Sequence, residues 1–367
     1  MSAPRLVSLD WQRGLLALSI MVYHLTSWKL YPPQSDEVLG RLGIYGVSMF
    51  FLLSGLSMAV VYRDFFVDAR SPLRFFVRRI FRIWPLMWFA VGAVTVGGVL
   101  FKAQAPDWGL ILLNVTTLFG FVSPGSYINT GAWSIGNEMV YYALTPPLLV
   151  LYGRRVLYGN LVVATTIAVG AYFAFAAMST ERTLAVQWQT YINPFNNLFF
   201  YCTGVAIYYN ARGLVLRPKD AVALLVVAVA LFCAYPADGD LVTIVTGVNR
   251  LVFFLASALA VLAFYKLTLP LPAAVSAPLT ALGLATYGVY LLHPIVYQFV
   301  ELATRALGHL RQAPVVMAAT MILTVLLSLL VYSRLEAPLI RLGKLLTTPT
   351  RPSLAAEAAL DAAPPNR

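Results

Sequence analysis

The stretch LDWQRGLLALSIMVYHL, residues 9–25, decides the fold of this chain. Apolar residues dominate it, and with its flanks it is long enough to cross a bilayer as one helix. Arg13 and His24 are unusual there, because both are polar groups inside an apolar run. Ionisable side chains within a spanning helix are costly to bury and are functional by default. We therefore expect a membrane helix that carries part of a functional site.

The rest of the sequence has the composition of a multi-span membrane protein. Of its 367 residues, 60% are hydrophobic and only 11% are charged, and the mean hydropathy is +0.76. A water-soluble domain of this size does not carry so apolar a composition. We expect a multi-pass protein of the plasma (inner) membrane.

Apolar runs of roughly 17 to 25 residues predict an all-α membrane protein with about ten transmembrane helices. A further apolar run, 108–122, is short and is followed by a polar, Gly-rich stretch. We interpret it as a re-entrant or interfacial segment rather than an eleventh span. The predicted spans are 11–28, 42–62, 82–101, 137–152, 158–178, 195–210, 220–236, 242–265, 281–302 and 314–333.

The distribution of basic residues predicts the orientation of these spans. With both termini in the cytoplasm, most of the 26 Lys and Arg residues fall in cytoplasmic loops, as the positive-inside rule requires. An eleventh span would instead move Arg154 and Arg155 to the outside. Membrane topology thus explains the net charge of +11, and no nucleic-acid partner is expected. We expect a transmembrane domain over 1–345 and a disordered cytoplasmic tail over 346–367, which is rich in Ala and Pro.

Arg13 and His24 are predicted to share one face of the first helix. They are eleven positions apart, which is about three turns and roughly 16 Å along the axis. In the predicted topology Arg13 lies near the cytoplasmic surface and His24 toward the outer one. Snorkelling to the headgroups explains Arg13 equally well, and an interhelical hydrogen bond is the alternative for His24. A histidine inside a span nevertheless favours function.

A second basic cluster, FVRRIFRIWPLMWF (residues 76–89), lies at the cytoplasmic end of the third predicted span. Arg79 and Arg82 are three positions apart and share a helical face. Their forked guanidinium groups suit a phosphorylated ligand that arrives from the cytosol. A positive-inside anchor is the alternative, and it is sufficient for Arg63, Arg70 and Arg74.

Two carboxylates and a second histidine are further candidates. Glu138 is predicted to open the fourth span at the outer surface, on the side of His24, where it can orient the imidazole or contact substrate; a helix N-terminal acid is the alternative. Glu336 is expected to pair with an arginine of the cytoplasmic mouth, and a purely structural ion pair explains it equally well. His293 precedes Pro294, so it is either an auxiliary acid/base group or a partner for carbonyl groups that the proline frees.

The remaining serines and the third histidine are not expected to take part in catalysis. No nucleophile elbow surrounds Ser48 or Ser54, and both are interpreted as helix-packing residues. The third histidine, His309, is placed in an outer loop beside basic residues. We therefore predict no metal site and no permanently bound cofactor.

Six motifs in order resemble the integral membrane acyltransferases of the acyltransferase 3 family. LDWQRGLLALSIMVYH is similar to the family's Arg, ten residues, then His; GIYGVSMFFLLSGLSM to its Gly-Val-x-x-Phe-Phe-x-x-Ser-Gly signature; and RRIFRIWPLMW to its Arg-x-x-Arg element. WSIGNEMVYY, TYGVYLLHPIV and SRLEAP are similar to its Trp-Ser-x-x-x-Glu, Ser-Tyr-x-x-Tyr-x-x-His-Pro and Ser-x-x-Glu-x-Pro elements. The motifs span residues 9–338, nearly the whole chain.

The resemblance implies an O-acyltransferase, a transferase of groups other than aminoacyl groups. Members of the acyltransferase 3 family move an acyl group, commonly acetyl, from cytoplasmic acyl-CoA to a hydroxyl of an extracytoplasmic carbohydrate or glycolipid. The donor is then acyl-CoA, with acetyl-CoA expected, and Arg13, Arg79 and Arg82 suit its phosphates. His24 is the expected general base, since an imidazole titrates near neutrality, and Glu138 is the second expected catalytic residue.

The same resemblance assigns the remaining positions within its motifs. Substrate contacts are expected from Trp133, Tyr287 and His293, and structural or auxiliary roles from Asp10 and Glu336. Some relatives carry an extracytoplasmic hydrolase-like domain, and this chain ends in a short tail instead. The expected partners are the lipid bilayer, acyl-CoA, a glycan acceptor, and either a second copy of the chain or a separate envelope protein.

A transporter that exports a glycan or a small anion is the alternative function. In that hypothesis Arg13, His24 and Arg250 line an alternating-access path through the membrane. The lack of an evident inverted repeat in the sequence and the ordered motifs count against it. Transfer or hydrolysis of acetyl-CoA by the purified protein separates the two hypotheses, because a pure transporter does neither.

Overall fold

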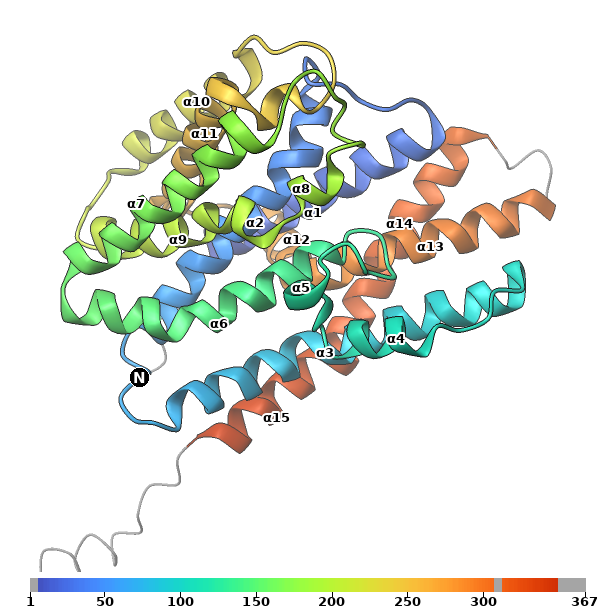
Figure 1. Ribbon diagram of the computed structural model, residues 1–367, viewed down its shortest axis with the longest axis horizontal. Coiled ribbons are helices and arrows are strands. Elements are labelled where there is room, and N and C mark those ends of the chain that lie inside the picture. Colours follow the sequence, from blue (N-terminus) through green and yellow to red (C-terminus); the bar gives the residue numbers. More distant parts are fainter. Residues whose placement is uncertain (1–5, 307–311, 349–367) are drawn as a thin grey trace, which may run out of the picture.

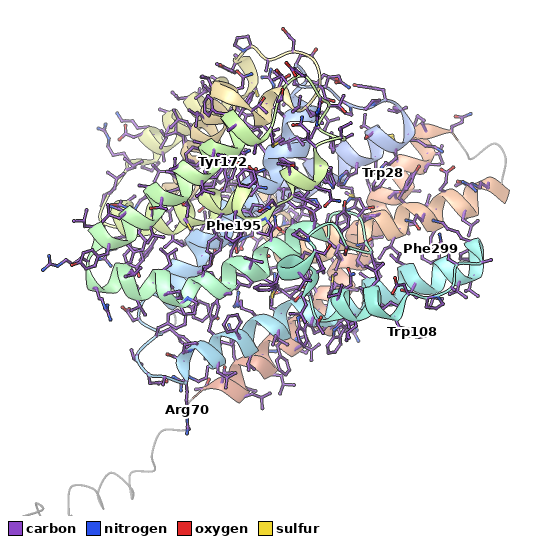
Figure 2. All side chains as sticks on the ribbon, in the orientation of Figure 1. Trp28, Arg70, Trp108, Tyr172, Phe195 and Phe299 are labelled. Carbon is purple, nitrogen blue, oxygen red and sulfur yellow. The ribbon has the colours of Figure 1, made fainter. Side chains whose placement is uncertain are left out.

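The computed structural model describes residues 6–306 and 312–348, and every regular element within these ranges is helical (Figure 1). Large aromatic side chains such as Tyr172, Phe195 and Phe299 point outward from the helices (Figure 2), as suits a bundle surrounded by lipid. The helices of 17 or more residues in this part of the chain are α1 (Val7–Lys29), α2 (Val38–Tyr62), α3 (Ser71–Lys102), α6 (Trp133–Arg154), α7 (Val156–Tyr172), α9 (Pro194–Ala211), α10 (Pro218–Ala234), α11 (Gly247–Lys266), α13 (Thr286–Ala306) and α14 (Ala313–Val331).

Each segment that the sequence predicted to span the membrane is largely helical. Across the described residues, five helical stretches are long and apolar enough to cross a bilayer, or up to six if a bent pair counts as one span. The all-α membrane class is therefore confirmed, whereas ten spans and two cytoplasmic termini stay predictions. Other helices are more polar or shorter: α1 contains Asp10, Gln12 and Arg13, and α10 has 17 residues.

The bent pair corrects one predicted boundary. Residues 281–302 were predicted as a single span, but α12 (Ala273–Leu284) and α13 meet there at 68°. Beside the break, Gly283 lies so close to α1 that an added Cβ would be 2.1 Å from the carbonyl oxygen of Asp10. The break is thus packed directly against the start of the first helix.

The end of the last predicted span also needs correction. The helix does not stop near 333 but continues through a π-helical turn, Tyr332–Glu336, into the amphipathic α15 (Ala337–Thr347). α15 lies beside α3, and a Cβ added to Gly343 would be 2.7 Å from the Cβ of Phe81 (Figure 1). The predicted disordered tail, 346–367, therefore begins inside a helix, and its residues from 349 onward lie outside the described residues.

The short apolar run at 108–122 does not form an eleventh span. It folds as α4 (Trp108–Val115) and α5 (Phe119–Val122), separated at Thr117, whose φ of 58° breaks the helix. An α-helix rises about 1.5 Å per residue, so neither piece can cross a membrane. α5 packs against α6 through a close approach of Gly120 and Gly136. The predicted interfacial or re-entrant character agrees with these two short helices.

The contact between α2 and α9 depends on two glycines. A Cβ added to Gly55 would lie 2.0 Å from the carbonyl oxygen of Tyr201, and one added to Gly204 would lie 2.0 Å from that of Leu52. Small residues at both crossing points let the two backbones touch, as is common where helices pack within membranes. This contact fixes α2, which lines both of the cavities described next.

Candidate active site

Two cavities lie inside the helical bundle, and each receives one of the two unusual residues of α1. The cavity that we call the arginine cavity contains Arg13 and has a volume of ≈ 450 Å³. The cavity that we call the histidine cavity contains His24 and has a volume of ≈ 300 Å³. Both are lined by Val47 of α2 and Tyr290 of α13. The two cavities therefore adjoin at these two side chains.

The three arginines predicted to bind phosphate groups, Arg13, Arg79 and Arg82, all line the arginine cavity. Arg13 is held on α1 by Asp10, with 3.1 Å between Nη1 and Oδ1, and its Nη2 also donates to Ser57 Oγ. The structural or auxiliary role expected for Asp10 stays a prediction, and its ion pair with Arg13 agrees with it. Residues of two different helices converge here because Arg13 of α1 and Arg79 of α3 both contact side chains of α2, namely Ser57 and Tyr62.

Aromatic rings fix the direction of Arg79. Its Nη2 donates to the hydroxyl of Tyr62 at 2.9 Å, and its guanidinium carbon lies 5.3 Å from the ring centre of Tyr62 and 5.6 Å from that of Tyr142. Contacts between guanidinium groups and aromatic faces are attractive. A cation held in this way is pre-organised for an anionic ligand.

The carboxylate of Glu336 pairs with Arg82, as the sequence predicted for an arginine of this mouth. Arg82 Nη1 and Glu336 Oε2 are 3.5 Å apart, which is longer than a hydrogen-bonded ion pair. Glu336 is only 2% exposed, and neither of its oxygens has a hydrogen bond within the described chain. Arg82 therefore keeps guanidinium N–H groups available to a ligand.

Other arginines near α3 are engaged outside the cavity. Arg74 Nη2 lies 2.6 Å from Asp68 Oδ2, and this hydrogen bond lowers the pKa of the Asp68 carboxyl. Arg63 bonds to Asp64 and to Tyr208, and Arg70 is exposed (Figure 2). These positions agree with the anchor interpretation and provide controls for the cavity arginines.

One basic residue of the arginine cavity was not predicted. Lys344 lines it from α15 together with Ile340 of the same helix. The amphipathic pattern after Pro338 was the available signal, but the segment was assigned to the end of the transmembrane domain. Lys344 raises the number of cations at this cavity.

Glu138 lies in the arginine cavity, so the prediction that it would be beside His24 was wrong. Its Oε1 accepts hydrogen bonds of 2.5 Å from both Ser54 Oγ and Tyr142 OH. Trp133, at the start of the same helix, lines the histidine cavity, and five positions along α6 carry the chain about 7.5 Å further. Ser54, interpreted as a packing residue, is thus a polar partner of Glu138. The catalytic role of Glu138 stays a prediction.

The partner of His24 is His293. His24 Nδ1 lies 2.8 Å from His293 Nε2, and His293 Nδ1 lies 3.0 Å from the carbonyl oxygen of Val289. His293 is fully buried, whereas His24 lines the cavity. The indole of Trp28 stacks on His24, with 5.1 Å between ring centres and 5° between planes. α1 and α13 together therefore hold an imidazole at the wall of a cavity.

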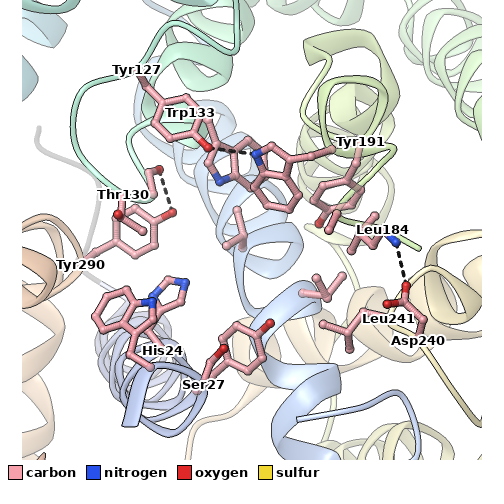
Figure 3. A pocket seen from close by; sticks show the side chains of 18 residues that line it. His24, Ser27, Tyr127, Thr130, Trp133, Leu184, Tyr191, Asp240, Leu241 and Tyr290 are labelled. Carbon is pink, nitrogen blue, oxygen red and sulfur yellow. Dashed lines mark hydrogen bonds between the residues drawn. The ribbon is translucent and has the colours of Figure 1, made fainter. Parts of the chain in front are cut away.

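Aromatic residues form much of the wall opposite His24. Trp133, expected to contact substrate, packs edge-on against Trp188, whose Nε1 donates to Tyr127 OH at 2.9 Å (Figure 3). Asp240 also lines this cavity, and its Oδ1 accepts the backbone N–H of Leu184 at 2.7 Å. Most of these residues lie in loops or in the short helix α8 (Trp188–Tyr191), where sequence periodicity gives no signal.

α13 connects the two cavities through residues spaced by three. Tyr287 lines the arginine cavity, Tyr290 lines both cavities, and His293 lies beside His24. The Tyr290 hydroxyl is 3.0 Å from the carbonyl oxygen of Gly131 and 2.8 Å from Ser134 Oγ. Tyr287 and His293, both expected to contact substrate, are therefore separated by the junction of the cavities.

Cationic and aromatic side chains line these cavities. In the ranges 6–306 and 312–348, no three His, Cys, Asp or Glu side chains are grouped closely enough to hold a metal ion. The arginines can instead hold a phosphorylated ligand, and the imidazole at the adjoining cavity can accept a proton from a hydroxyl group.

Comparison with known proteins gives one family over most of the chain. A family described as "Acyltransferase domain" matches residues 6–333. The chain is 30% identical to the exopolysaccharide production protein ExoZ of Rhizobium meliloti (strain 1021) over 326 residues, which cover 83% of this chain and 91% of that protein. No solved structure matches the chain.

Two further relatives match shorter segments. The acyltransferase MdmB of Streptomyces mycarofaciens is 30% identical over 170 residues, 41% of each chain. The putative peptidoglycan O-acetyltransferase YrhL of Bacillus subtilis (strain 168) is 27% identical over 161 residues, 39% of this chain and 23% of that protein. The match thus spans less than half the length of these two relatives.

Proposed function

The chain belongs to this acyltransferase family, and we propose that it moves an acyl group from cytoplasmic acyl-CoA to a hydroxyl group of a carbohydrate or glycolipid outside the inner membrane. Acetyl is the acyl group that we expect, with acetyl-CoA as the donor. One observation carries the proposal: α1 presents Arg13 to a basic cavity and His24 to an adjoining aromatic one. Donor phosphates and acceptor hydroxyl would then be bound on opposite sides of one junction.

The proposed topology has ten spans and both termini in the cytoplasm. The arginine cavity then opens toward the cytosol, where acyl-CoA is available. The exposed Arg63 and Arg70 near this cavity support that orientation, because cytoplasmic loops are enriched in basic residues.

The donor site uses the cations of the arginine cavity. Coenzyme A carries several phosphate charges, and Arg13, Arg79, Arg82 and Lys344 supply four cations around one cavity. Bidentate hydrogen bonds from guanidinium to phosphate are strong and directional. With the phosphates held there, the acyl thioester extends toward Tyr290 and the histidine cavity.

The chemical step takes place at His24. Its imidazole removes the proton from the acceptor hydroxyl while that oxygen attacks the thioester carbonyl carbon. A C–O ester bond forms, the C–S bond breaks, and the CoA sulfur leaves and takes up the proton. Both reactants are oriented by the protein, which lowers the entropic part of the barrier.

The aromatic wall of the histidine cavity supports a carbohydrate acceptor. Sugar rings present apolar C–H faces and polar hydroxyl edges, and Trp133, Trp188 and Tyr127 offer flat apolar surfaces with N–H or O–H groups at their rims. The names of two relatives, an exopolysaccharide production protein and a putative peptidoglycan O-acetyltransferase, also support a glycan acceptor.

A transfer assay tests the proposed function. The purified protein in lipid nanodiscs receives acetyl-CoA labelled in the acetyl group, with and without envelope glycan fractions. We expect protein-dependent release of CoA thiol and labelled glycan whose label is lost after mild alkali, as for an ester. Folded protein that neither transfers nor hydrolyses acetyl-, succinyl- or longer acyl-CoA would rule the proposal out.

That negative result is what the transporter alternative predicts. One observation counts against this alternative: Arg250, assigned to its path, lines neither cavity. It is 2% exposed and donates to the backbone carbonyl oxygens of Asn196 at 2.8 Å and Val245 at 3.2 Å. Arg250 therefore stabilises the packing of α9 and α11.

Loss of a cavity arginine is expected to weaken donor binding. Arg79→Ala and Arg82→Ala each remove one charge-assisted hydrogen bond to a phosphate, so each should weaken acyl-CoA binding by about 1 to 3 kcal/mol. The measurement is calorimetric titration of the folded variants with acetyl-CoA.

The matched control for both variants is Arg70→Ala, which removes an exposed arginine immediately before α3. Its affinity for acetyl-CoA should equal that of the wild type at physiological ionic strength, where distant surface charges are screened. Wild-type affinity in both cavity variants would leave Arg79 and Arg82 as membrane anchors only.

A further inference from the structure

The hydrogen-bond partners of His293 determine which of its ring nitrogens carries the proton. Nδ1 lies 3.0 Å from the carbonyl oxygen of Val289, which can only accept. Nδ1 therefore carries a hydrogen. A buried imidazolium is costly without an ion-pair partner, and the rings of Trp28 and Tyr290 surround His293. The neutral ring then has an unprotonated Nε2, which is an acceptor.

That assignment decides the tautomer of His24. Its Nδ1 lies 2.8 Å from His293 Nε2, so His24 Nδ1 must donate the hydrogen. The two rings are inclined by only 13°, which is compatible with an N–H···N bond in the ring planes. A neutral His24 with a hydrogen on Nδ1 has a free lone pair on Nε2.

We propose that His293 is a positioning residue that fixes His24 as the tautomer with an unprotonated Nε2. The stacked indole of Trp28 holds the plane of the same imidazole, so the orientation of the ring and the place of its proton are both set. A series of hydrogen bonds runs from the Val289 carbonyl through His293 to His24. It ends at the histidine cavity, and Nε2 of His24 is the basic nitrogen at its end.

The consequence for catalysis rests on the proposed function. As Nε2 removes the acceptor proton, His24 becomes an imidazolium whose Nδ1–H remains bonded to His293 Nε2. A buried carboxylate has this role in the Ser-His-Asp arrangement, where it holds the tautomer and stabilises the charged ring. Here a neutral imidazole, fully buried and anchored to a backbone carbonyl, has the corresponding place.

Three substitutions of His293 test whether catalysis depends on the position of its acceptor atom or on the volume of its ring. His293→Gln can place an amide oxygen near the position of Nε2, His293→Asn places its polar atoms near that of Nδ1, and His293→Phe keeps the ring without an acceptor. We expect Phe and Asn to lower kcat by about 10²-fold or more and Gln to recover most of that loss. The acetyl-CoA affinity of all three should stay within about twofold of wild type, because His293 lies outside the arginine cavity.

A spectroscopic measurement reads the tautomer directly. The full sequence contains three histidines, so ¹⁵N-histidine labelling in a His309→Gln background leaves only the two rings of interest. Solid-state ¹⁵N NMR without acyl-CoA should give a protonated Nδ1 and an unprotonated Nε2 for both rings. In His293→Phe, His24 should shift to a mixture of tautomers.

The results of these experiments can contradict the positioning role of His293 independently of the proposed function. An Nε2–H tautomer of His24 in the otherwise wild-type protein, equal kcat for folded Gln and Asn variants, or wild-type kcat for folded Phe would each overturn the proposal. The NMR spectrum needs no acyl transfer, so the assigned tautomers in an inactive protein would support the positioning role of His293 while the function proposed above failed.

Discussion

The His24→Ala variant is expected to lose acyl transfer while it still folds, inserts and binds acyl-CoA. A general base contributes about 10²- to 10⁴-fold to the rate, so turnover per folded molecule should fall by that factor. Donor affinity should not change, since His24 lines the histidine cavity and the cavity arginines lie beyond Tyr290. A large loss in kcat at constant affinity is characteristic of an interaction made in the transition state.

The comparison needs transfer rates normalised to folded protein, together with acetyl-CoA titration. Ser19→Ala is the matched control on the same helix, because Ser19 bonds to the backbone oxygen of Leu15 and lines neither cavity. Misfolding of His24→Ala, or activity that follows the amount of folded protein, would mean that His24 is a packing residue.

The Gly55→Leu variant is expected to lose the folded state. Its Cβ alone would lie 2.0 Å from the carbonyl oxygen of Tyr201, and a backbone atom cannot move aside as a side chain can. α2 and α9 must separate, and overpacking of this kind destabilises by about 3 kcal/mol or more. Both cavities should be disrupted together, because α2 lines both.

Gly92→Leu is the matched control, since nothing lies within 4 Å of a Cβ added to Gly92 in α3. Thermal unfolding and size-exclusion profiles of the two variants in one detergent give the comparison. A Gly55→Leu protein with the melting temperature of Gly92→Leu would contradict the close contact between α2 and α9.

The long helices and the arginines of the arginine cavity could be predicted from the sequence. Apolar runs placed the long helices, and residue spacing brought together Arg79 and Arg82. The break between α12 and α13 could not be predicted, because the residues on its two sides are similarly apolar and its partner, the start of α1, is far away in sequence. Long-range packing, rather than local propensity, set these boundaries.

The other half of the site depends on contacts between distant positions. His24 and His293 are 269 positions apart, and their pairing leaves no periodic signal. Glu138 was assigned to the correct helix but to the wrong cavity, because α6 lines both cavities: Trp133 lines the histidine cavity, whereas Ser134 and Glu138 line the arginine cavity. A residue pattern can identify which side chains are unusual, but their neighbours follow only from the fold.

The junction at Val47 and Tyr290 has a consequence for the energetics of the cell. In the proposed topology the two cavities face the cytosol and the exterior, so a continuous water-filled passage would let protons flow down their electrochemical gradient. The Tyr290 hydroxyl is instead bonded to Gly131 and Ser134, and its ring lies where the cavities adjoin. On the proposed function, an enzyme built in this way would deliver an acyl group across the bilayer without discharging the membrane potential.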